Sequence, residues 1–287
     1  MNTAPSDPIA VFGGTGQQGG AVIDALLARG AHVRALVRNP ESERSQALAE
    51  REVELARIAI DDPASLAAGL QGVAAFFFMT TPESPSLPHI EEETQQGIAL
   101  VDAAVTASTP YVVFSSVGGA ERDSGVPHFE SKRRVEEYLE KSGLPATILR
   151  PVAFMDNFAV MGPTVENGEL VLRWPLPDHI PLQLIAARDI GQLSAAFLLG
   201  TAEAPGGTLE IAGDERTGSQ LAAAFGEQAG LPARYEALPL EVLGDNEDGQ
   251  AMFRWFAETS AYQADIDAVR AIEPTLWDFP AWLRARG

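Results

Sequence analysis

Ile9-Ala-Val-Phe-Gly-Gly-Thr-Gly-Gln-Gln-Gly-Gly20 is the stretch that decides the fold of this chain. Its first four residues form an apolar run typical of a strand that is buried on both faces. Glycines follow at positions 13, 16 and 19, and an apolar helical stripe comes next, formed by Val22, Ile23, Leu26 and Leu27. A strand, a glycine turn and a helix in this order predict a dinucleotide site, where the helix N-terminus directs its free N–H groups at the phosphates. An ordinary tight turn is the alternative interpretation.

The composition is that of a globular protein, with 46% hydrophobic residues in a chain of 287. The formal net charge is −20, and such a surface repels nucleic-acid phosphates and anionic lipid, so we expect neither as a partner. No apolar run reaches the roughly 18 residues of a membrane span. Residues 1–8 lack the basic segment followed by an apolar segment that is typical of a signal peptide. The chain has no cysteine, which excludes disulfides and thiolate metal sites. We therefore expect a cytoplasmic protein. The sequence does not determine its oligomeric state.

Six alternations of strand and helix fill the first half of the chain. The expected strands lie at 9–12, 31–37, 53–60, 73–79, 111–116 and 146–150, and the expected helices after the first at 41–51, 89–108 and 128–142. A further short helix is expected after Asp61-Asp-Pro63, with Asp62 as its N-cap and Pro63 in its first turn. This alternation predicts an α/β fold with a doubly wound parallel sheet. Ligands of such sheets bind at the carboxyl ends of the strands, which here are Gly13, Arg38, Met79 to Thr81, Ser115-Ser116 and Pro151.

Beyond Pro151 the pattern is looser and predicts a smaller C-terminal α/β lobe. We expect a helix at 152–160, strands at 169–174, 181–186 and 208–211, a helix from an Asp189 cap to Leu199, and a helix at 219–229. The expected domains are 1–150 for nucleotide binding and 151–287 for a substrate or lid lobe, with 181–200 returning to the large sheet.

Arginine replaces the usual acid at the end of the second strand. A site specific for NAD places Asp or Glu about 20 residues beyond the glycines, to bind the ribose 2′-hydroxyl. Residues 33–40 contain no acid and carry Arg34 and Arg38 instead. Arginine accommodates a 2′-phosphate, so NADP(H) is the preferred cofactor, with NAD(H) as the second choice. A solvated charge at a strand end is the alternative for Arg38.

His89 and the acids Glu91-Glu-Glu93 stand together at the start of the third expected helix. Such a group could bind a metal. Acids in a first helical turn interact favourably with the helix dipole, which explains them without a ligand. We therefore expect no metal site.

Several further motifs resemble the NmrA-like family of atypical short-chain dehydrogenases/reductases. They are Gly13–Gly20, Val33–Pro40, Pro63-Ala-Ser-Leu with Gly72-Val, His128–Lys132, Leu144–Pro151, Asp189-Ile-Gly191, Phe253–Phe256 and Trp282-Leu283. The last two motifs resemble the human-type branch of NADPH sensors in particular. The resemblance covers the whole chain and implies an NAD(P)-binding Rossmann domain with a small C-terminal lobe over a cleft. Members of the family include sensors of NADP(H) and reductases that act on quinones, aromatic ethers, isoflavones and dyes.

The strand ends and the resemblance together give the candidate site residues. The cofactor-binding candidates are Gly13, Thr15, Gly16, Gln17, Gln18, Gly19, Arg38, Met79, Thr80, Ser115, Lys132, Pro151 and Phe154. Phe154, Asn157 and Trp174 are candidate walls of a substrate pocket, although as a group they fit a core equally well.

One departure from the family pattern concerns catalysis. Ordinary short-chain dehydrogenases use a Tyr-x-x-x-Lys pair, in which tyrosine is the general acid and lysine binds the nicotinamide ribose. Here the pair reads His128-Phe-Glu-Ser-Lys132, with i, i+4 spacing on one helix face. Histidine exchanges a proton near neutral pH, so His128 is the candidate replacement, and a surface histidine is the alternative. Lys132 is the candidate contact to the ribose or the substrate.

A second departure concerns the adenine. The resemblance implies Gly-Asp at the end of the third strand, with the Asp contacting adenine, where this chain has Ile58-Ala59. A charged hydrogen bond is worth about 1.5–3 kcal/mol, so its loss weakens dinucleotide binding unless Asp61 or Asp62 compensates.

Two functions are compatible with these residues. The first is an oxidoreductase that transfers hydride between NADPH and a small unsaturated or aromatic substrate, such as a quinone, an enone or a polyketide-like compound. The second is a catalytically weak NADP(H) sensor that acts through a regulatory protein partner. Lys132 favours the enzyme, and the missing tyrosine favours the sensor.

Overall fold

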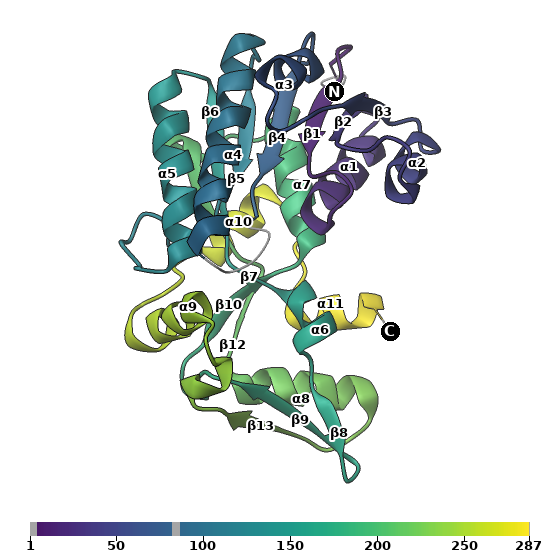
Figure 1. Cartoon of the computed structure of the whole chain (residues 1–287). Helices are drawn as coiled ribbons and strands as arrows, with labels where there is room; N and C mark the ends of the chain where they lie inside the picture. The colour runs from purple at the N-terminus through teal and green to yellow at the C-terminus, as the bar shows by residue number, and fades with distance from the viewer. Residues whose placement is uncertain (1–4, 82–86, 287) are drawn as a thin grey trace.

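A parallel sheet of seven strands forms the larger of two lobes in the computed structural model, which describes residues 5–81 and 87–286 (Figure 1). The strand order is β11-β6-β5-β4-β1-β2-β3, and all neighbouring pairs are parallel. The strands are β1 (Ile9–Phe12), β2 (Val33–Val37), β3 (Glu54–Arg57), β4 (Ala75–Met79), β5 (Val112–Ser115), β6 (Ala146–Pro151) and β11 (Thr208–Ile211). The order reverses at β1, which confirms the predicted doubly wound Rossmann sheet.

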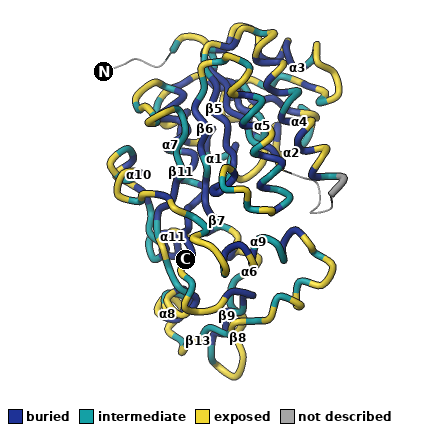
Figure 2. The backbone as a smooth tube through the Cα atoms, turned by 90° about the vertical axis from the view of Figure 1, so that its left-hand side faces the viewer, coloured by how far each residue is buried: buried dark blue, intermediate teal, exposed yellow. Residues whose placement is uncertain are grey.

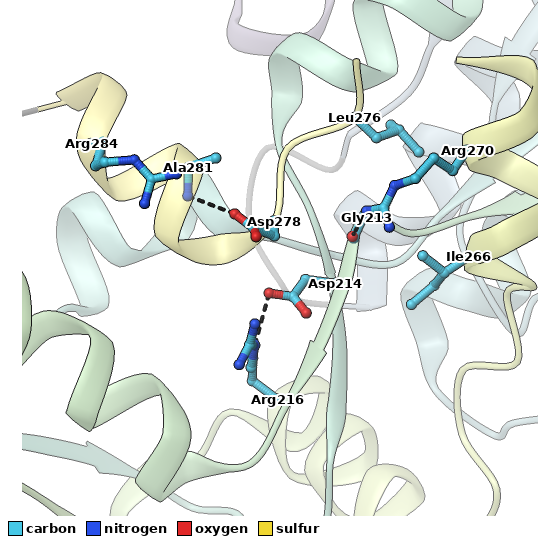
Figure 3. A pocket seen from close by; sticks show the side chains of 9 residues that line it. All are labelled: Gly213, Asp214, Arg216, Ile266, Arg270, Leu276, Asp278, Ala281 and Arg284. Carbon is cyan, nitrogen blue, oxygen red and sulfur yellow. Dashed lines mark hydrogen bonds and ion pairs between the residues drawn. The ribbon is translucent and has the colours of Figure 1, made fainter. Parts of the chain in front are cut away.

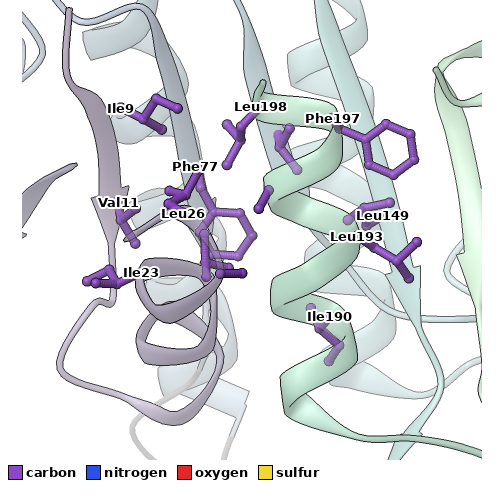
Figure 4. Packing of buried hydrophobic residues seen from close by; sticks show 14 of the residues in the cluster. Ile9, Val11, Ile23, Leu26, Phe77, Leu149, Ile190, Leu193, Phe197 and Leu198 are labelled. Atoms are coloured by element: carbon purple, nitrogen blue, oxygen red, sulfur yellow. The ribbon is translucent and has the colours of Figure 1, made fainter. Parts of the chain in front are cut away.

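Helices cover both faces of this sheet. They are α1 (Gln17–Ala28), α2 (Glu43–Ala49), α3 (Pro63–Gly69), α4 (Leu87–Thr106), α5 (Pro127–Ser142) and α7 (Ala187–Leu198). Ile9 and Val11 face the core beneath α1 and α7 (Figure 4), whereas Ala10 faces the opposite core, with α3, α4 and α5. Both faces of β1 are therefore buried, as its apolar run predicts. None of the helices in the described residues is both long and apolar enough to span a bilayer.

The small lobe lies beyond the carboxyl edge of the large sheet (Figure 1). One three-stranded sheet has the order β13-β9-β8, and a second, β12-β10-β7, lies between it and the large sheet. Figure 2 shows buried residues concentrated in the large sheet and exposed ones along the outer small lobe.

The remaining elements of the chain, in sequence order, are β7 (Ala153–Phe154), a 3-10 turn (Met155–Asn157), α6 (Phe158–Met161), β8 (Thr164–Glu166), β9 (Glu169–Trp174), β10 (Leu182–Ile185), a 3-10 turn (Pro205–Gly207), β12 (Asp214–Arg216), α8 (Gly218–Ala229), β13 (Ala233–Ala237), a 3-10 turn (Leu240–Leu243), α9 (Glu247–Glu258), α10 (Ile266–Ile272) and α11 (Phe279–Arg286).

Local capping signals set the starts of several helices. The carboxylate of Asp62 accepts hydrogen bonds from the N–H groups of Ala64 and Ser65, at 3.0 and 3.3 Å, and Pro63 is the first residue of α3, as predicted. Ser42 caps α2, so that helix begins at Glu43, and it ends at Ala49, within the predicted 41–51. Thr217 and Gln220 form a capping box at the start of α8.

The single helix predicted at 152–160 is wrong. Ala153 and Phe154 instead form β7 and pair with β10 in parallel, and a 3-10 turn and the short α6 follow. The pairing with a strand thirty residues away overrides the local helical pattern.

Asp189 is not the N-cap of α7, which begins two residues earlier at Ala187. Its fully buried carboxylate instead accepts a hydrogen bond from the N–H of Trp277 at 2.8 Å, and burial raises its pKa above the ordinary value. The cap of α7 comes from a distant residue, because Asp156 accepts the N–H of Ala187 at 2.8 Å.

The segment 181–200 is divided between two layers. Its helix, α7, packs on α1 against the large sheet, whereas its strand, β10, belongs to the intermediate three-stranded sheet. The strand that extends the large sheet is β11, which pairs with β6. The division at residue 150 remains a prediction.

The contact between α1 and α7 is tight enough to be tested. A Cβ atom at Gly191 would lie 2.3 Å from the backbone oxygen of Ala21, so Gly191→Ala forces the two helices apart. We expect this change to lower the free energy of unfolding by about 1–3 kcal/mol, measured by urea denaturation.

Gly20→Ala in α1 is the matched control, because its Cβ would have ordinary contact, 3.6 Å from the oxygen of Gly14. Alanine is the better helix former by about 1 kcal/mol, so this variant should be at least as stable as the parent protein. Equal stability of the two variants would contradict the close packing.

Candidate functional site

The glycine turn leaves the N-terminus of α1 open at the carboxyl edge of the sheet. Gly13 has a φ of +78°, and the N–H of Gly16 donates to its oxygen at 2.9 Å. A Cβ at Gly19 would lie 2.3 Å from the same oxygen, so only glycine allows this close approach. Gly16 is the N-cap and has no side chain, and the first turn of α1 contains no acid. No side chain therefore occupies the backbone N–H groups of the first turn of α1, and these groups can receive an anionic ligand.

The ends of β4 and β5 meet this turn. The sulfur of Met79 would lie 3.3 Å from a Cβ at Gly13, so the Met79 side chain lies beside the glycine. The hydroxyl of Ser115 donates to Oε1 of Gln18 at 2.8 Å. The structure thus brings these predicted residues together, while Thr15 and Gln17 of the same turn are exposed.

Lys132 lies in a buried polar network at the end of β4. Its Nζ donates to Oε1 of Glu93 at 2.5 Å and to the backbone oxygen and hydroxyl of Thr80 at 2.5 and 3.2 Å. Ser131 donates to the other carboxylate oxygen of Glu93 at 2.7 Å. All four residues are buried. The three ammonium hydrogens of Lys132 thus have three acceptors. A ribose hydroxyl could accept only by sharing the hydrogen that makes the longest contact, the one to the Thr80 hydroxyl.

Glu93 is the site residue that sequence reasoning missed. The helix α4 begins at Leu87, earlier than predicted, so its first turn contains no acid and the three glutamates lie in the next turn. Glu91 and Glu92 are exposed, but Glu93 is 2% exposed. His89 contacts Glu92, and no three His, Asp or Glu side chains among residues 5–81 and 87–286 are grouped to hold a metal. Three adjacent glutamates look alike in sequence, and only their burial separates them.

His128 is oriented by a carboxylate of the small lobe. Its Nδ1 lies 2.8 Å from Oδ1 of Asp248 in α9, and its backbone N–H donates to the same oxygen at 3.0 Å. This contact leaves Nε2 as the ring nitrogen for a further partner. Although His128 and Lys132 are four residues apart, their side chains contact different elements, α9 and the end of β4.

A cavity of about 400 Å³ opens at the ends of β2 and β3. Its lining residues are Arg38, Arg57, Ile58, Ala59, Ile60, Asp61 and Ser65. Arg38 is exposed, whereas Arg34 lies in β2 and pairs with Glu54 at 2.8 Å. Arg34 also donates to the backbone oxygen of Gln71, at 2.7 Å. Of the two arginines in this segment, only Arg38 is therefore available to a ligand in the cavity.

The other predicted residues have mixed surroundings. Pro151 is buried at the end of β6, Phe154 is half-buried in β7, and Asn157 is exposed. Trp174 lies in the aromatic core of the small lobe, where it stacks on Phe158 at 4.7 Å and donates its indole N–H to the oxygen of Met161. A substrate role for Phe154, Asn157 and Trp174 remains a prediction.

A second cavity, of about 420 Å³, lies among β12, α10 and α11 (Figure 3). Its charged walls largely satisfy one another. Asp214 accepts from Nε of Arg216 at 2.8 Å and from the N–H of Phe279 at 2.9 Å, and Asp278 accepts from the N–H of Ala281. None of the predicted cofactor residues lines this cavity.

Comparison with known proteins gives a consistent result. A family model described as the NmrA-like family matches residues 5–282. An NAD(P)H azoreductase of Xenophilus azovorans is 29% identical over 245 residues, which cover 85% of this chain and 82% of the azoreductase.

Two solved structures have the same fold. The NADPH complex of the Escherichia coli quinone oxidoreductase QOR2 has a TM-score of 0.77 at 23% identity, and covers 97% of this chain and 99% of that one. NmrA, a negative transcriptional regulator, has a TM-score of 0.82 at 22% identity, and covers 98% and 95%. At these identities the structural likeness concerns the fold alone.

The buried network makes a prediction for stability. Glu93→Gln would leave the Lys132 ammonium buried without a counter-charge, and we expect a loss of about 3–5 kcal/mol in the free energy of unfolding. Urea denaturation measures the loss.

The double variant Glu93→Gln, Lys132→Met is the control, because it removes both charges together. It should recover most of the stability lost in the single variant. A double variant as unstable as Glu93→Gln would show that the ion pair is not the source of the effect.

Proposed function

The chain belongs to the NmrA-like family, and we propose that it is an oxidoreductase that binds NADP(H). In this proposal it transfers hydride between NADPH and a small unsaturated or aromatic compound, such as a quinone, an enone or a polyketide-like molecule. The observation that carries it is the arrangement along one sheet edge. The open N-terminus of α1 stands between the cavity beside Arg38 and the buried Lys132.

The residues at this edge fit a dinucleotide with a 2′-phosphate. The first-turn N–H groups of α1 would hold the pyrophosphate, and Arg38 would bind the 2′-phosphate. Thr80, Ser115 and Lys132 would hold the nicotinamide half. NAD(H) would be the weaker ligand.

The bound cofactor would supply the hydride, and the chain would supply the proton and the surroundings. His128 is the proposed proton donor through Nε2, and Asp248 is its positioning residue. Lys132 would polarise the substrate or hold the ribose, and Met79 and Phe154 would exclude water. The azoreductase and quinone oxidoreductase relatives support a flat, unsaturated substrate, as their names indicate.

A sensor of NADP(H) is the second candidate. Its support is that Lys132 already has an acceptor for each ammonium hydrogen and that histidine stands where tyrosine is usual. The regulator NmrA shares the fold. In this alternative, cofactor occupancy changes the binding of a protein partner.

One experiment separates these functions. NADPH and NADH are titrated against the purified protein, and the absorbance of the reduced nicotinamide is followed with a panel of quinones, azo dyes and aromatic enones. Turnover with any acceptor supports the oxidoreductase. Tight NADPH binding without turnover across the panel favours the sensor, and failure to bind either cofactor rejects both functions.

Arg38→Ala should weaken NADPH binding about tenfold or more and affect NADH much less, because a charged hydrogen bond is worth about 1.5–3 kcal/mol. Isothermal titration with both cofactors measures the ratio. Equal losses for NADPH and NADH would remove the assignment of the 2′-phosphate to Arg38.

His128→Asn should lower kcat about 100-fold while leaving the Kd for NADPH within about twofold, because it removes the proton donor but no proposed cofactor contact. Asp248→Asn should have a smaller effect in the same direction. The control is His89→Gln, since half-buried His89 pairs with Glu92 away from the proposed site and its loss should not change kcat. An unchanged kcat in His128→Asn would exclude His128 as the donor.

A further inference from the structure

Arg57 lies beside Arg38 at the same edge of the sheet. The strands β2 and β3 are parallel neighbours in which Val37 pairs with Arg57, and the N–H of Ile58 donates to the oxygen of Val37 at 2.9 Å. Arg38 follows Val37 directly, so two arginines from adjacent strands reach the mouth of one cavity of about 400 Å³.

Both guanidinium groups are available. Among residues 5–81 and 87–286, neither Arg38 nor Arg57 has a hydrogen bond or an ion pair with another side chain, and both are exposed. Arg34 and Arg51 are paired with acids, so what distinguishes Arg38 and Arg57 is that both are exposed and line one cavity. A pair of free arginines at one cavity is suited to a phosphate, whose oxygens match the guanidinium fork.

The rest of the cavity wall favours the same kind of ligand. Ala59 contributes only a methyl group, and its N–H donates to the hydroxyl of Ser65 at 3.1 Å. Ile58 and Ile60 add apolar surface, and Asp61 is the one acid among the lining residues. A carboxylate at position 59 would bring negative charge to the cavity and repel a phosphate dianion.

We propose that Arg57 is a second specificity-determining residue, which binds the 2′-phosphate of NADP(H) together with Arg38, and that the small side chain at position 59 keeps the cavity electropositive for this purpose. The proposal rests on the NADP(H) binding proposed above. At the end of β3, Arg57 would then contact the 2′-phosphate, whereas the family pattern has a carboxylate at position 59 that contacts adenine.

Arg57→Ala tests the assignment by calorimetry with four probes, NADPH, NADH, 2′,5′-ADP and 5′-AMP. Loss of one charged contact should weaken NADPH and 2′,5′-ADP about tenfold and leave NADH and 5′-AMP within about twofold. Added salt should lower the affinity of the parent protein for 2′,5′-ADP more than that of the variant, because the variant binds the phosphate with one fewer cation.

Arg44→Ala is the matched control. Arg44 is an exposed arginine of the neighbouring helix α2, outside the cavity, and its removal changes the net charge equally. It should leave the binding of all four probes unchanged. Circular dichroism and urea denaturation check that each variant is folded.

Ala59→Asp tests the same idea in the opposite direction. The added carboxylate should weaken NADPH and 2′,5′-ADP about tenfold without weakening NADH, because only the ligands with a 2′-phosphate are repelled.

The outcomes separate this inference from the proposed function. Failure of the parent protein to bind NADPH overturns both. Tight NADPH binding that Arg57→Ala leaves unchanged, or weakens to the same extent as NADH binding, overturns the role of Arg57 alone.

Discussion

At Gly19 the backbone of α1 packs directly on the oxygen of Gly13, leaving no room for a side chain. This contact fixes where the first helix begins and points its open N-terminus at the edge where β1, β4 and β5 end. A second contact of the same kind, Gly191 on Ala21, brings α7 against α1. These two backbone contacts, each possible only with glycine, thus position α1 and α7 against the large sheet. The polar groups at the carboxyl edge of the sheet depend on the position of α1.

The two halves of the site solve different physical problems. Arg38 and Arg57 are exposed, so their charges cost little and remain free for a ligand. Lys132 is buried, where an unpaired ammonium would be very unfavourable, and Glu93 and Thr80 offset that cost. The accessible half presents its charges to solvent, as the proposed anion site requires. The buried half holds a cation in one place, as both proposed functions require.

The features that could be predicted from the sequence are those encoded locally. The apolar strands, the glycine turn and the Asp62 cap of α3 each depend on neighbouring residues, and the predicted sheet followed from them. The features that were missed depend on distant ones. Neither α5 nor α7 is capped by its own N-cap side chain; the aspartates at 248 and 156 bind the first-turn N–H groups from other segments. The burial of Glu93 is likewise set by the packing of α4 on α5.

The hydrogen-bond partners of His128 and Lys132 lie in different lobes of the protein. All the acceptors of Lys132 belong to the large lobe, and the glycine turn and the arginine cavity lie there too. Only His128 is oriented from the small lobe, through Asp248. In the proposed function the large lobe would therefore supply most of the cofactor contacts, whereas proton donation by an oriented His128 would also require the small lobe. The two proposed functions differ in whether the contact between His128 and Asp248 serves the bound cofactor, because both would bind it through the same large-lobe residues.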